Sequence, residues 1–417
     1  MKAWPSTYIP PIDVYGRDNS QPVPSLRLHN SLTGLNSEIL EDRVTMYVCG
    51  ITPYDATHLG HAATYLTFDL IKRFLQFRGQ TVTYVQNITD VDDPLLERAQ
   101  RDGIAWQDLA ESQIALFRDD MTALKVLPPD HYMGAVETIP WVIDAINSLK
   151  ERGAVYQLEG DLYFDVNKDP NFDSYNALSN EQRLAIFGER GGDPARLGKR
   201  NPLDCLIWKG HREGEPSWES PFGSGRPGWH IECTAIALHF LSAPISIQGG
   251  GSDLHFPHHS MCAAEGRVLS EKNFARRFVH TGMIGLDGEK MSKSRGNLKF
   301  VSEMRNQGID PNVLRVALLT GHYREDRSWS QELLESSIKR ISLWRNAISS
   351  PYGGDVSVLI ESCIQRLSDD LDTPGVFALL DEWAENRVAS MANVSVDDVS
   401  QIGKLSRFLD AVLGVTL

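Results

Sequence analysis

Hydrophobic residues recur along this chain in two rhythms, which predict alternating strands and helices. Short apolar runs at 44–48 and 81–85 are typical of buried β-strands. Between them, apolar residues recur every three or four positions from Gly60 to Phe77, which predicts a helix with one buried face. A strand, a helix and a second strand in this order predict a βαβ unit with parallel pairing and a right-handed crossover.

The rest of the chain extends this pattern into an α/β domain with an insertion and a helical end. The first forty residues lack periodicity and are rich in Pro, Ser and Asn, which predicts an irregular arm. Apolar runs at 245–248 and 278–281 resume the sheet after a polar, largely helical stretch. We expect an N-terminal arm (1–40), the first half of the α/β domain (41–125), a connecting insertion (126–200), the second half (201–300), a linker (301–330) and a C-terminal helical bundle (331–417).

Composition and charge argue against several classes of protein, although they leave room for a local basic patch. The 417-residue chain has 41 Lys and Arg against 55 Asp and Glu, a formal net charge of −14, which argues against a broad nucleic-acid surface. No apolar run approaches the length of a membrane span, and the start lacks the apolar core of a secretion signal. The five cysteines are irregularly spaced, which indicates thiols or metal ligands rather than a disulfide framework. We therefore expect a cytoplasmic protein that binds no membrane.

Two short motifs, far apart in the chain, together predict chemistry on ATP. They are His58-Leu59-Gly60-His61 and Lys290-Met291-Ser292-Lys293-Ser294. Two imidazoles can stabilise the charge that grows when a carboxylate attacks the α-phosphorus, and two lysines can hold the departing pyrophosphate. Either motif alone is as consistent with an ordinary helix start or a solvated loop. The histidine motif lies between a predicted strand and a predicted helix, where nucleotides bind in open α/β sheets.

Two cysteines and a histidine form a candidate metal site: Cys49, Cys233 and His258. Two thiolates and an imidazole suit zinc, and three protein ligands leave a fourth position open for a substrate. We expect all three residues at the carboxyl ends of strands in one sheet, beside the histidine motif. The alternative is two buried cysteines and a loop histidine, because this long-range spacing has no zinc-finger signature. An open zinc beside an ATP site would suit a thiol substrate, since zinc binds thiolates well.

These motifs make the chain resemble the cysteine-activating class I synthetase superfamily over most of its length. The resemblance is carried by Tyr47 to Gly50, the histidine motif, Asn87 to Asp93, Gly214 to Trp218, Gly225 to Cys233, Gly249 to Asp253, Phe256 to His259 and the lysine motif. It implies a Rossmann-like α/β catalytic domain with an insertion and a C-terminal helical bundle. It also implies ATP with Mg²⁺, L-cysteine as the activated substrate, and one Zn²⁺ held by Cys49, Cys233 and His258.

The superfamily includes cysteinyl-tRNA synthetase and the ligase that joins cysteine to glucosaminyl-inositol in mycothiol biosynthesis. This chain is more similar to the ligase, because His61 is followed by Ala62-Ala63-Thr64 where the tRNA enzyme has Ala-Arg. It also contains the ligase hallmark at 189–194 and stops soon after its helical bundle. The resemblance implies an AMP-forming carbon–nitrogen ligase that uses no nucleic acid, and we expect a monomer. The alternatives are a tRNA-charging enzyme and a catalytically idle relative that binds zinc or thiols.

The resemblance also implies roles for individual residues. Catalysis would use His58, His61, Lys290 and Lys293. Cysteine would be bound by Cys49, Gly50, Ile51, Thr52, Thr89 and Trp229. ATP and the adenylate would be bound by Thr64, Asn87, Thr89, Gly251, Ser252, Asp253, Ile284, Lys290, Met291, Ser292, Lys293 and Ser294. The acceptor-side motif would be Glu189, Arg190, Gly191, Gly192, Asp193 and Pro194.

The sequence leaves two points of the site open. The tRNA enzyme has a glutamate four residues after its zinc histidine, where this chain has Cys262. On a helix, His258 and Cys262 would share a face, so Cys262 could offer a fourth thiolate. We favour a packed thiol outside the site, because a metal closed by four protein ligands would hinder exchange of a substrate thiol. For the base that takes a proton from the acceptor amine, Asp55 and Glu232 are candidates, and spacing favours neither.

Overall fold

The chain folds around a parallel five-stranded sheet with the strand order β11-β10-β3-β4-β5. The structure is a computed structural model, and it describes residues 1–11, 22–291, 296–349, 355–390 and 399–417. The strand order reverses at β3, so a crevice for ligands is expected at the carboxyl ends of β3 and β10. The strands are β3 (Arg43–Val48), β4 (Thr81–Ile88), β5 (His131–Gly134), β10 (Ile247–Gly251) and β11 (Phe278–Thr281).

Helices cover both faces of this sheet, and each face has its own hydrophobic core. One core contains the central helix α1, which begins within the histidine motif and is buried along most of its length, together with α3 and α9. The other core contains α4, α6 and α7. The bounds are α1 (Leu59–Phe77), α2 (Asp93–Asp102), α3 (Trp106–Ala123), α4 (Ile139–Glu151), α6 (Trp229–Phe240), α7 (Ser260–Ser270) and α9 (Pro311–Leu319).

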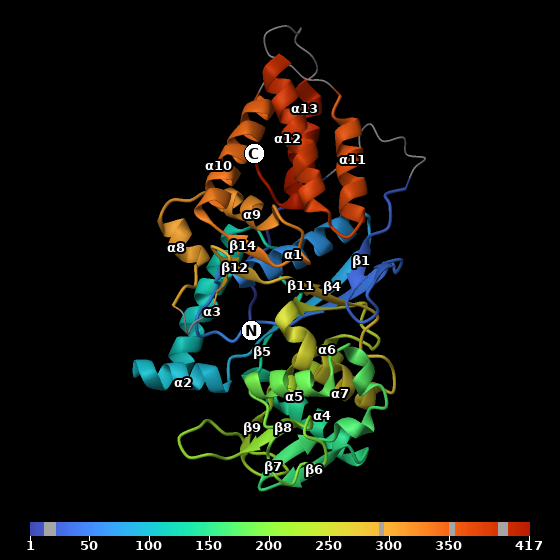
Figure 1. Cartoon of the computed structure of the whole chain (residues 1–417), viewed down its shortest axis with the longest axis vertical. Helices are drawn as coiled ribbons and strands as arrows, with labels where there is room; N and C mark the ends of the chain where they lie inside the picture. The colour runs from blue at the N-terminus through green and yellow to red at the C-terminus, as the bar shows by residue number, and fades with distance from the viewer. Residues whose placement is uncertain (12–21, 292–295, 350–354, 391–398) are drawn as a thin grey trace.

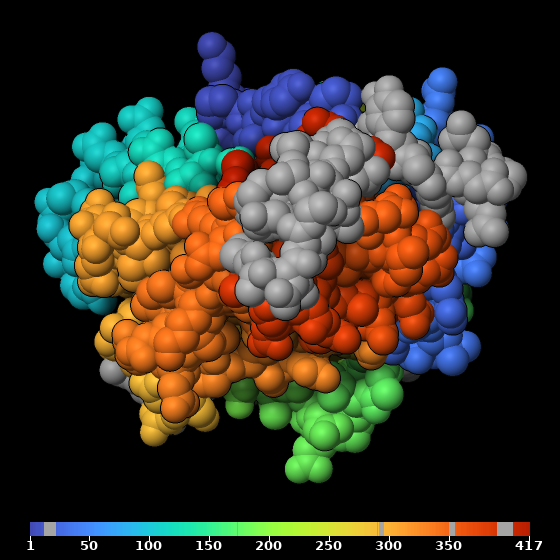
Figure 2. Space-filling view, turned by 90° about the horizontal axis from the view of Figure 1, so that it is seen from above, coloured from blue at the N-terminus to red at the C-terminus, as the bar shows by residue number. Residues whose placement is uncertain are grey.

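The insertion and the C-terminal helices lie at opposite ends of the molecule, with the central sheet between them (Figure 1). Seen from above, the C-terminal helices form much of the surface (Figure 2). The insertion holds an antiparallel sheet of β6 (Val155–Leu158), β7 (Asp161–Phe164), β8 (Cys205–Gly210) and β9 (Gly225–Pro227), with helix α5 (Asn180–Glu189). The C-terminal helices are α10 (Gln331–Ser349), α11 (Ser357–Ser368), α12 (Thr373–Ser390) and α13 (Val399–Phe408).

Short elements connect the α/β domain to the bundle. Helix α8 (Val301–Asn306) comes shortly after the lysine motif. A three-stranded sheet, in the order β13-β12-β14, joins the lysine-motif region to the chain before α10. Its strands are β12 (Ile284–Leu286), β13 (Glu289–Lys290) and β14 (Arg327–Trp329).

The structure differs from the expected boundaries at three places. Strand β5 belongs to the central sheet although it lies beyond residue 125, because a four-residue edge strand has no apolar run to reveal it. Strands β8 and β9 pair onto β7, so the insertion extends past residue 200. Part of the arm that was predicted to be irregular forms a hairpin of β1 (Arg27–Asn30) and β2 (Leu35–Glu38). Gly34 takes a φ of +71° between these strands, which glycine adopts without strain.

None of the helices in the described part of the chain is long and apolar enough to cross a membrane.

A buried ion cluster ties α1 to α9 and to the end of the chain. Arg73 Nε donates to Asp69 Oδ2 at 2.8 Å, and Arg315 donates to the same oxygen. Arg315 Nε also donates to the Leu413 carbonyl at 2.6 Å. Burial alone would raise the pKa of Asp69, but the charges of Arg315 and Arg73 outweigh it and hold this pKa below its ordinary value. The cluster therefore stabilises the fold only while Asp69 is ionised.

Replacing Asp69 with asparagine is expected to destabilise the protein by about 3–5 kcal/mol, because it leaves two buried guanidinium groups without a counter-charge. Urea unfolding should measure this, with Asp381→Asn as the control, because the Asp381–Arg340 pair is partly exposed and worth about 1 kcal/mol or less. The contribution of Asp69 should be present above its unfolded-state pKa of about 3.9 and be lost as the pH falls through the lower folded-state value. Equal destabilisation by both variants would contradict the role of the cluster.

Candidate active site

A cavity of about 330 Å³ opens at the carboxyl ends of the central strands, where the strand order reverses. Segments distant in sequence meet in its wall: the loop after β3, the first turns of α1, the start of α6 and the loops after β10 and β11. The predicted residues that line it are Cys49, Gly50, Ile51, Thr52, His58, His61, Thr64, Trp229, Gly251, Asp253, Ile284 and Met291. The cavity therefore brings together most of the predicted cysteine and nucleotide residues.

The histidine motif caps the start of α1 inside this cavity. His58 Nδ1 accepts the backbone N–H groups of Gly60 at 3.1 Å and His61 at 3.4 Å, as an N-cap side chain does. The two imidazole rings stack with their centres 3.6 Å apart. Burial lowers the pKa of His58 to about 4 and that of His61 well below its ordinary value. Both rings are therefore neutral near pH 7, and because Nδ1 of His58 is an acceptor, its proton is assigned to Nε2.

The lysine motif is only partly described. The side chain of Lys290 and the residues Ser292, Lys293 and Ser294 lie outside the described residues, whereas Met291 is buried and lines the cavity. The chain just after the motif pairs with the histidine motif, because Leu59 N donates to the Lys299 carbonyl at 2.9 Å. This contact places the segment that follows the lysine motif beside the start of α1.

The three predicted metal ligands converge. The ligand atoms of Cys49, Cys233 and His258 lie within 4.8 Å of one another, and all three residues are buried. Cys49 follows β3 and His258 lies in η5 (His255–His259), after β10, but Cys233 lies in helix α6. The prediction that all three lie at strand ends was therefore wrong for Cys233. Strand β9 ends at Pro227, and Cys233 lies in the helix α6 that follows it. Two thiols and an imidazole at these separations fit a metal ion, and zinc suits the donor set.

Further polar groups, which the sequence analysis did not identify, surround the metal ligands. His258 Nδ1 lies 3.0 Å from Nδ1 of His230, which leaves Nε2 of His258 for the metal. Gln248 Nε2 donates to Cys49 Sγ at 3.4 Å, and His259 Nε2 lies 3.3 Å from the same sulfur. His230 and His259 lie within the quoted motifs and Gln248 directly precedes one, which is the only signal that could have indicated these three residues. An acceptor for the His258 Nδ1–H, supplied by His230, and a donor to the Cys49 sulfur, supplied by Gln248, orient the ligands before a metal binds.

Cys262 lies beside the metal cluster without belonging to it. Its sulfur is 3.8 Å from His258 Nε2 and donates to the His230 carbonyl at 3.4 Å. The group that could hold a metal comprises Cys49, Cys233 and His258, with Cys262 packed behind it. This arrangement agrees with the interpretation of Cys262 as a neighbouring thiol.

The Cys262→Ala variant is therefore expected to keep its metal, with an affinity within about tenfold of wild type, since only packing near the ligands is lost. Competition with a chromogenic chelator measures the affinity. Loss of stoichiometric metal in a variant that unfolds at the wild-type temperature would instead make Cys262 a ligand.

Other predicted residues support the cavity wall from behind. Asn87 Oδ1 accepts the Gly50 N–H at 2.8 Å, and its amide nitrogen donates to Thr89 Oγ1 at 3.3 Å. Gly50 has no room for a side chain, because an added Cβ would lie 1.7 Å from the Asn87 carbonyl oxygen. Among the described residues that line the cavity, neither Asn87, Thr89 nor Ser252 is present. Asn87 and Thr89 thus support the loop around Gly50 that lines the cavity.

The two candidate bases differ in position. Asp55 lines the cavity and forms an ion pair with Arg98 at 2.6 Å. Glu232 is fully buried in α6, and it is absent from the described residues that line the cavity. The acceptor-side motif at 189–194 is also absent from the described lining; its Arg190 reaches the Phe256 carbonyl instead.

Comparison with known proteins defines the class first. The family model of the class I tRNA synthetase (C) catalytic domain matches residues 36–339. The solved structure of Mycobacterium tuberculosis methionyl-tRNA synthetase in complex with methionyl-adenylate has a similar fold, with a TM-score of 0.63 and 16% identity over 89% of each chain. The chain therefore contains a class I synthetase catalytic domain, and its fold is that of this class.

Curated relatives narrow the class to one family. Proteins named L-cysteine:1D-myo-inositol 2-amino-2-deoxy-alpha-D-glucopyranoside ligase match from Thermomonospora curvata, at 50% identity over 100% of both chains, and from Streptomyces griseus, at 51% over 100% of both. The Salinispora tropica protein of the same name is 56% identical over 89% of this chain and 93% of its own. The chain belongs to this ligase family.

Proposed function

We propose that this chain activates L-cysteine with ATP and transfers it to the amine of glucosaminyl-inositol, as the ligase step of mycothiol biosynthesis. The observation that carries the proposal is that Cys49, part of the buried metal cluster, lines the same cavity as His58 and His61. A thiol-selective metal beside a phosphate-binding motif suits an amino acid with a thiol side chain. The choice of acceptor rests on the relatives, whose name specifies an amino-inositol glycoside over the full length of the chain.

In the first half-reaction, the cysteine carboxylate attacks the α-phosphorus of ATP and diphosphate leaves. The neutral imidazoles of His58 and His61 donate hydrogen bonds to the phosphate oxygens, where negative charge grows in the transition state. Lys290 and Lys293 would hold the departing diphosphate as point charges, and Mg²⁺ would accompany ATP. The product is cysteinyl adenylate.

Selection of cysteine is assigned to Cys49, Cys233 and His258. Zinc is the metal that this donor set suits best, and a bound zinc ion would supply a position for the substrate thiolate that serine cannot fill well. A merely hydrophobic pocket distinguishes similar side chains by only about 10- to 200-fold. Trp229 stacks on the His258 ring, with the ring centres 4.4 Å apart, so it can cover the side of the metal histidine next to the substrate.

In the second half-reaction, the neutral amine of glucosaminyl-inositol attacks the cysteinyl carbonyl. A carbon–nitrogen bond forms, the carbon–oxygen bond to AMP breaks, and the amine loses one proton. Asp55 is the better of the two candidate bases, because it lines the cavity, whereas the Glu232 side chain in α6 is buried. The reaction as a whole is that of an AMP-forming carbon–nitrogen ligase.

The test supplies folded, zinc-loaded protein with ATP, cysteine and either glucosaminyl-inositol or tRNA, and measures AMP. We expect AMP and an amide product with the amino sugar and not with tRNA. AMP formed only with tRNA would make the chain a tRNA-charging enzyme. No AMP with either acceptor, and no cysteine-dependent exchange of pyrophosphate into ATP, would indicate the catalytically idle relative.

A further inference from the structure

The insertion holds the segment that carries the metal histidine. Three of its polar groups reach this segment on both sides of His258. In chain order, the Tyr175 carbonyl lies 3.1 Å from His255 Nε2, Asn176 Nδ2 donates to Ser260 Oγ at 3.4 Å, and Arg190 Nη1 donates to the Phe256 carbonyl oxygen. These contacts join two parts of the chain that are about 65 to 85 residues apart in sequence.

The Phe256 carbonyl needs a partner from outside its own segment. Phe256 has extended backbone angles, φ −136° and ψ 135°, between residues that have helical angles. Its carbonyl therefore lies outside the helical hydrogen-bond pattern. In a regular helix the Ser260 N–H would donate to the Phe256 carbonyl, but here it donates to the Pro257 carbonyl instead. A buried carbonyl without a donor is costly, and Arg190 supplies the donor. The contact lies two residues before His258.

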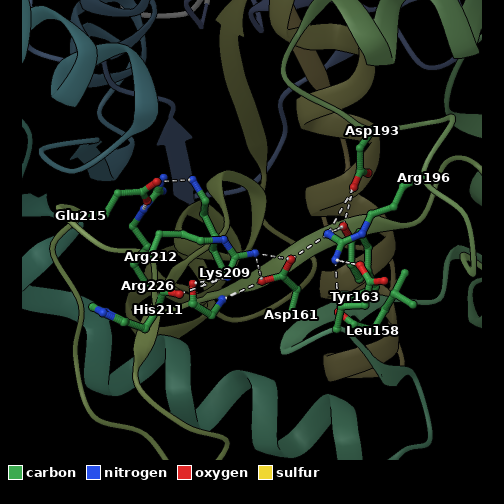
Figure 3. Close-up of polar contacts among 12 residues, drawn as sticks. Leu158, Asp161, Tyr163, Asp193, Arg196, Lys209, His211, Arg212, Glu215 and Arg226 are labelled. Atoms are coloured by element: carbon green, nitrogen blue, oxygen red, sulfur yellow. Dashed lines mark hydrogen bonds and ion pairs between the residues drawn. The ribbon is translucent and has the colours of Figure 1, made fainter.

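Arg190 is itself held in place by the rest of its motif. Gly192 N donates to the Phe187 carbonyl at 2.8 Å, and a side chain at Gly192 would lie 2.6 Å from the Phe187 ring. Asp193 accepts from Lys199 Nζ at 2.8 Å and from the Tyr163 hydroxyl. Figure 3 shows Asp193 directed toward Tyr163 and Arg196, and Arg196 in turn directed toward Asp161 on β7. Hydrogen bonds and ion pairs thus fix the motif against the sheet of the insertion.

We propose that Arg190 is a positioning residue for the metal site, and that the 189–194 motif holds the His258 segment rather than the acceptor. The motif is absent from the described residues that line the cavity, while its guanidinium contacts the backbone next to the metal histidine. Arg190 sets the position of the Phe256 carbonyl, and through it the direction from which His258 approaches Cys49 and Cys233. This inference rests on the proposed function for its kinetic readouts, but not for metal affinity.

The test compares Arg190→Ala with Glu181→Ala, since Glu181 is an exposed residue of α5 outside the motif. We expect Arg190→Ala to weaken zinc binding about 10- to 100-fold in chelator competition, as loss of a residue that orients a ligand does. The KM for cysteine in ATP–pyrophosphate exchange should rise, while the KM for glucosaminyl-inositol stays within about twofold. Glu181→Ala should match wild type in all three, and Arg190→Lys, which keeps a donor, should recover part of the zinc affinity.

Two outcomes would overturn the inference. One is wild-type zinc affinity in Arg190→Ala with a raised KM for glucosaminyl-inositol, which would make the motif part of the acceptor site. The other is zinc affinity and all kinetic constants equal to wild type. If Arg190→Ala does not fold, Asn176→Ala removes a second contact to the same segment, and wild-type zinc affinity in that variant would count against the inference. Failure of the wild-type protein to exchange pyrophosphate would instead refute the proposed function and leave the affinity test valid.

Discussion

The Cys233→Ala variant is expected to lose cysteine-dependent ATP–pyrophosphate exchange by at least about a thousandfold. Removing one of three metal ligands removes several kcal/mol of binding and orientation, and each 1.36 kcal/mol is a factor of ten in rate. The variant should also lose its metal, because Cys49 and His258 alone cannot hold it tightly. Isotope exchange and metal analysis of the purified variant measure both effects.

The matched control is Cys363→Ala. Cys363 is also buried, but it lies in α11 of the helical bundle, away from the cavity. Its truncation should cost some stability through a small void, and should leave exchange within about twofold of wild type. Equal loss of exchange in the two variants would show that the Cys233 effect reflects folding rather than metal binding.

The His61→Ala variant is expected to slow adenylate formation by about 100- to 1,000-fold with little change in cysteine affinity. A donor aimed at charge that develops only in the transition state contributes to the rate rather than to ground-state binding. His61 is partly buried in the cavity wall and stacks on His58, which holds its ring in place. Single-turnover formation of cysteinyl adenylate gives the rate. The control is His239→Ala, because His239 lies near the C-terminal end of α6, stacks on Trp141 and is not among the described residues that line the cavity.

The pH dependence follows from the lowered pKa values of the same pair. Because burial brings the pKa of His58 to about 4, the neutral, donating form is already complete above about pH 5.5. The contribution of the pair should be lost only as the pH falls toward 4, and the ratio of wild-type to His61→Ala rates should stay constant between about pH 6 and pH 8. A ratio that rises as the pH falls, with a midpoint near 6.5, would mean that an imidazolium is the active form.

Much of the fold could be predicted because its central elements carry strong periodic patterns. The strands β3 and β4 and helix α1 lie where the apolar runs at 44–48 and 81–85 and the three- to four-residue rhythm predicted them. Strand β5 was not predicted because its sequence, His131-Tyr132-Met133-Gly134, has no continuous apolar run. The strand joins the sheet only by pairing with β4. Long-range pairing decided this strand, and also the extension of the insertion to β8 and β9.

The candidate site divides in the same way. Residues within motifs, such as His58, Cys49 and His258, could be predicted because each needs a particular side chain. The fold brings His58 and Cys49 to one cavity and places His258 beside Cys49. The position of Cys233 in a helix could not be predicted without knowing where β9 ends. The supporting contact from Arg190 to the Phe256 carbonyl involves a backbone atom, which leaves no trace in the sequence. A monomeric state and a cytoplasmic location stay predictions.

The most direct test of the account is zinc X-ray absorption spectroscopy on the zinc-loaded protein, with and without cysteine. The account predicts two sulfur ligands and one imidazole from the free protein, supplied by Cys49, Cys233 and His258, and one additional sulfur when cysteine binds. Serine should leave the sulfur count unchanged. Three sulfur ligands in the free protein, or no change on adding cysteine, would contradict the claim that this site selects its substrate through the thiol.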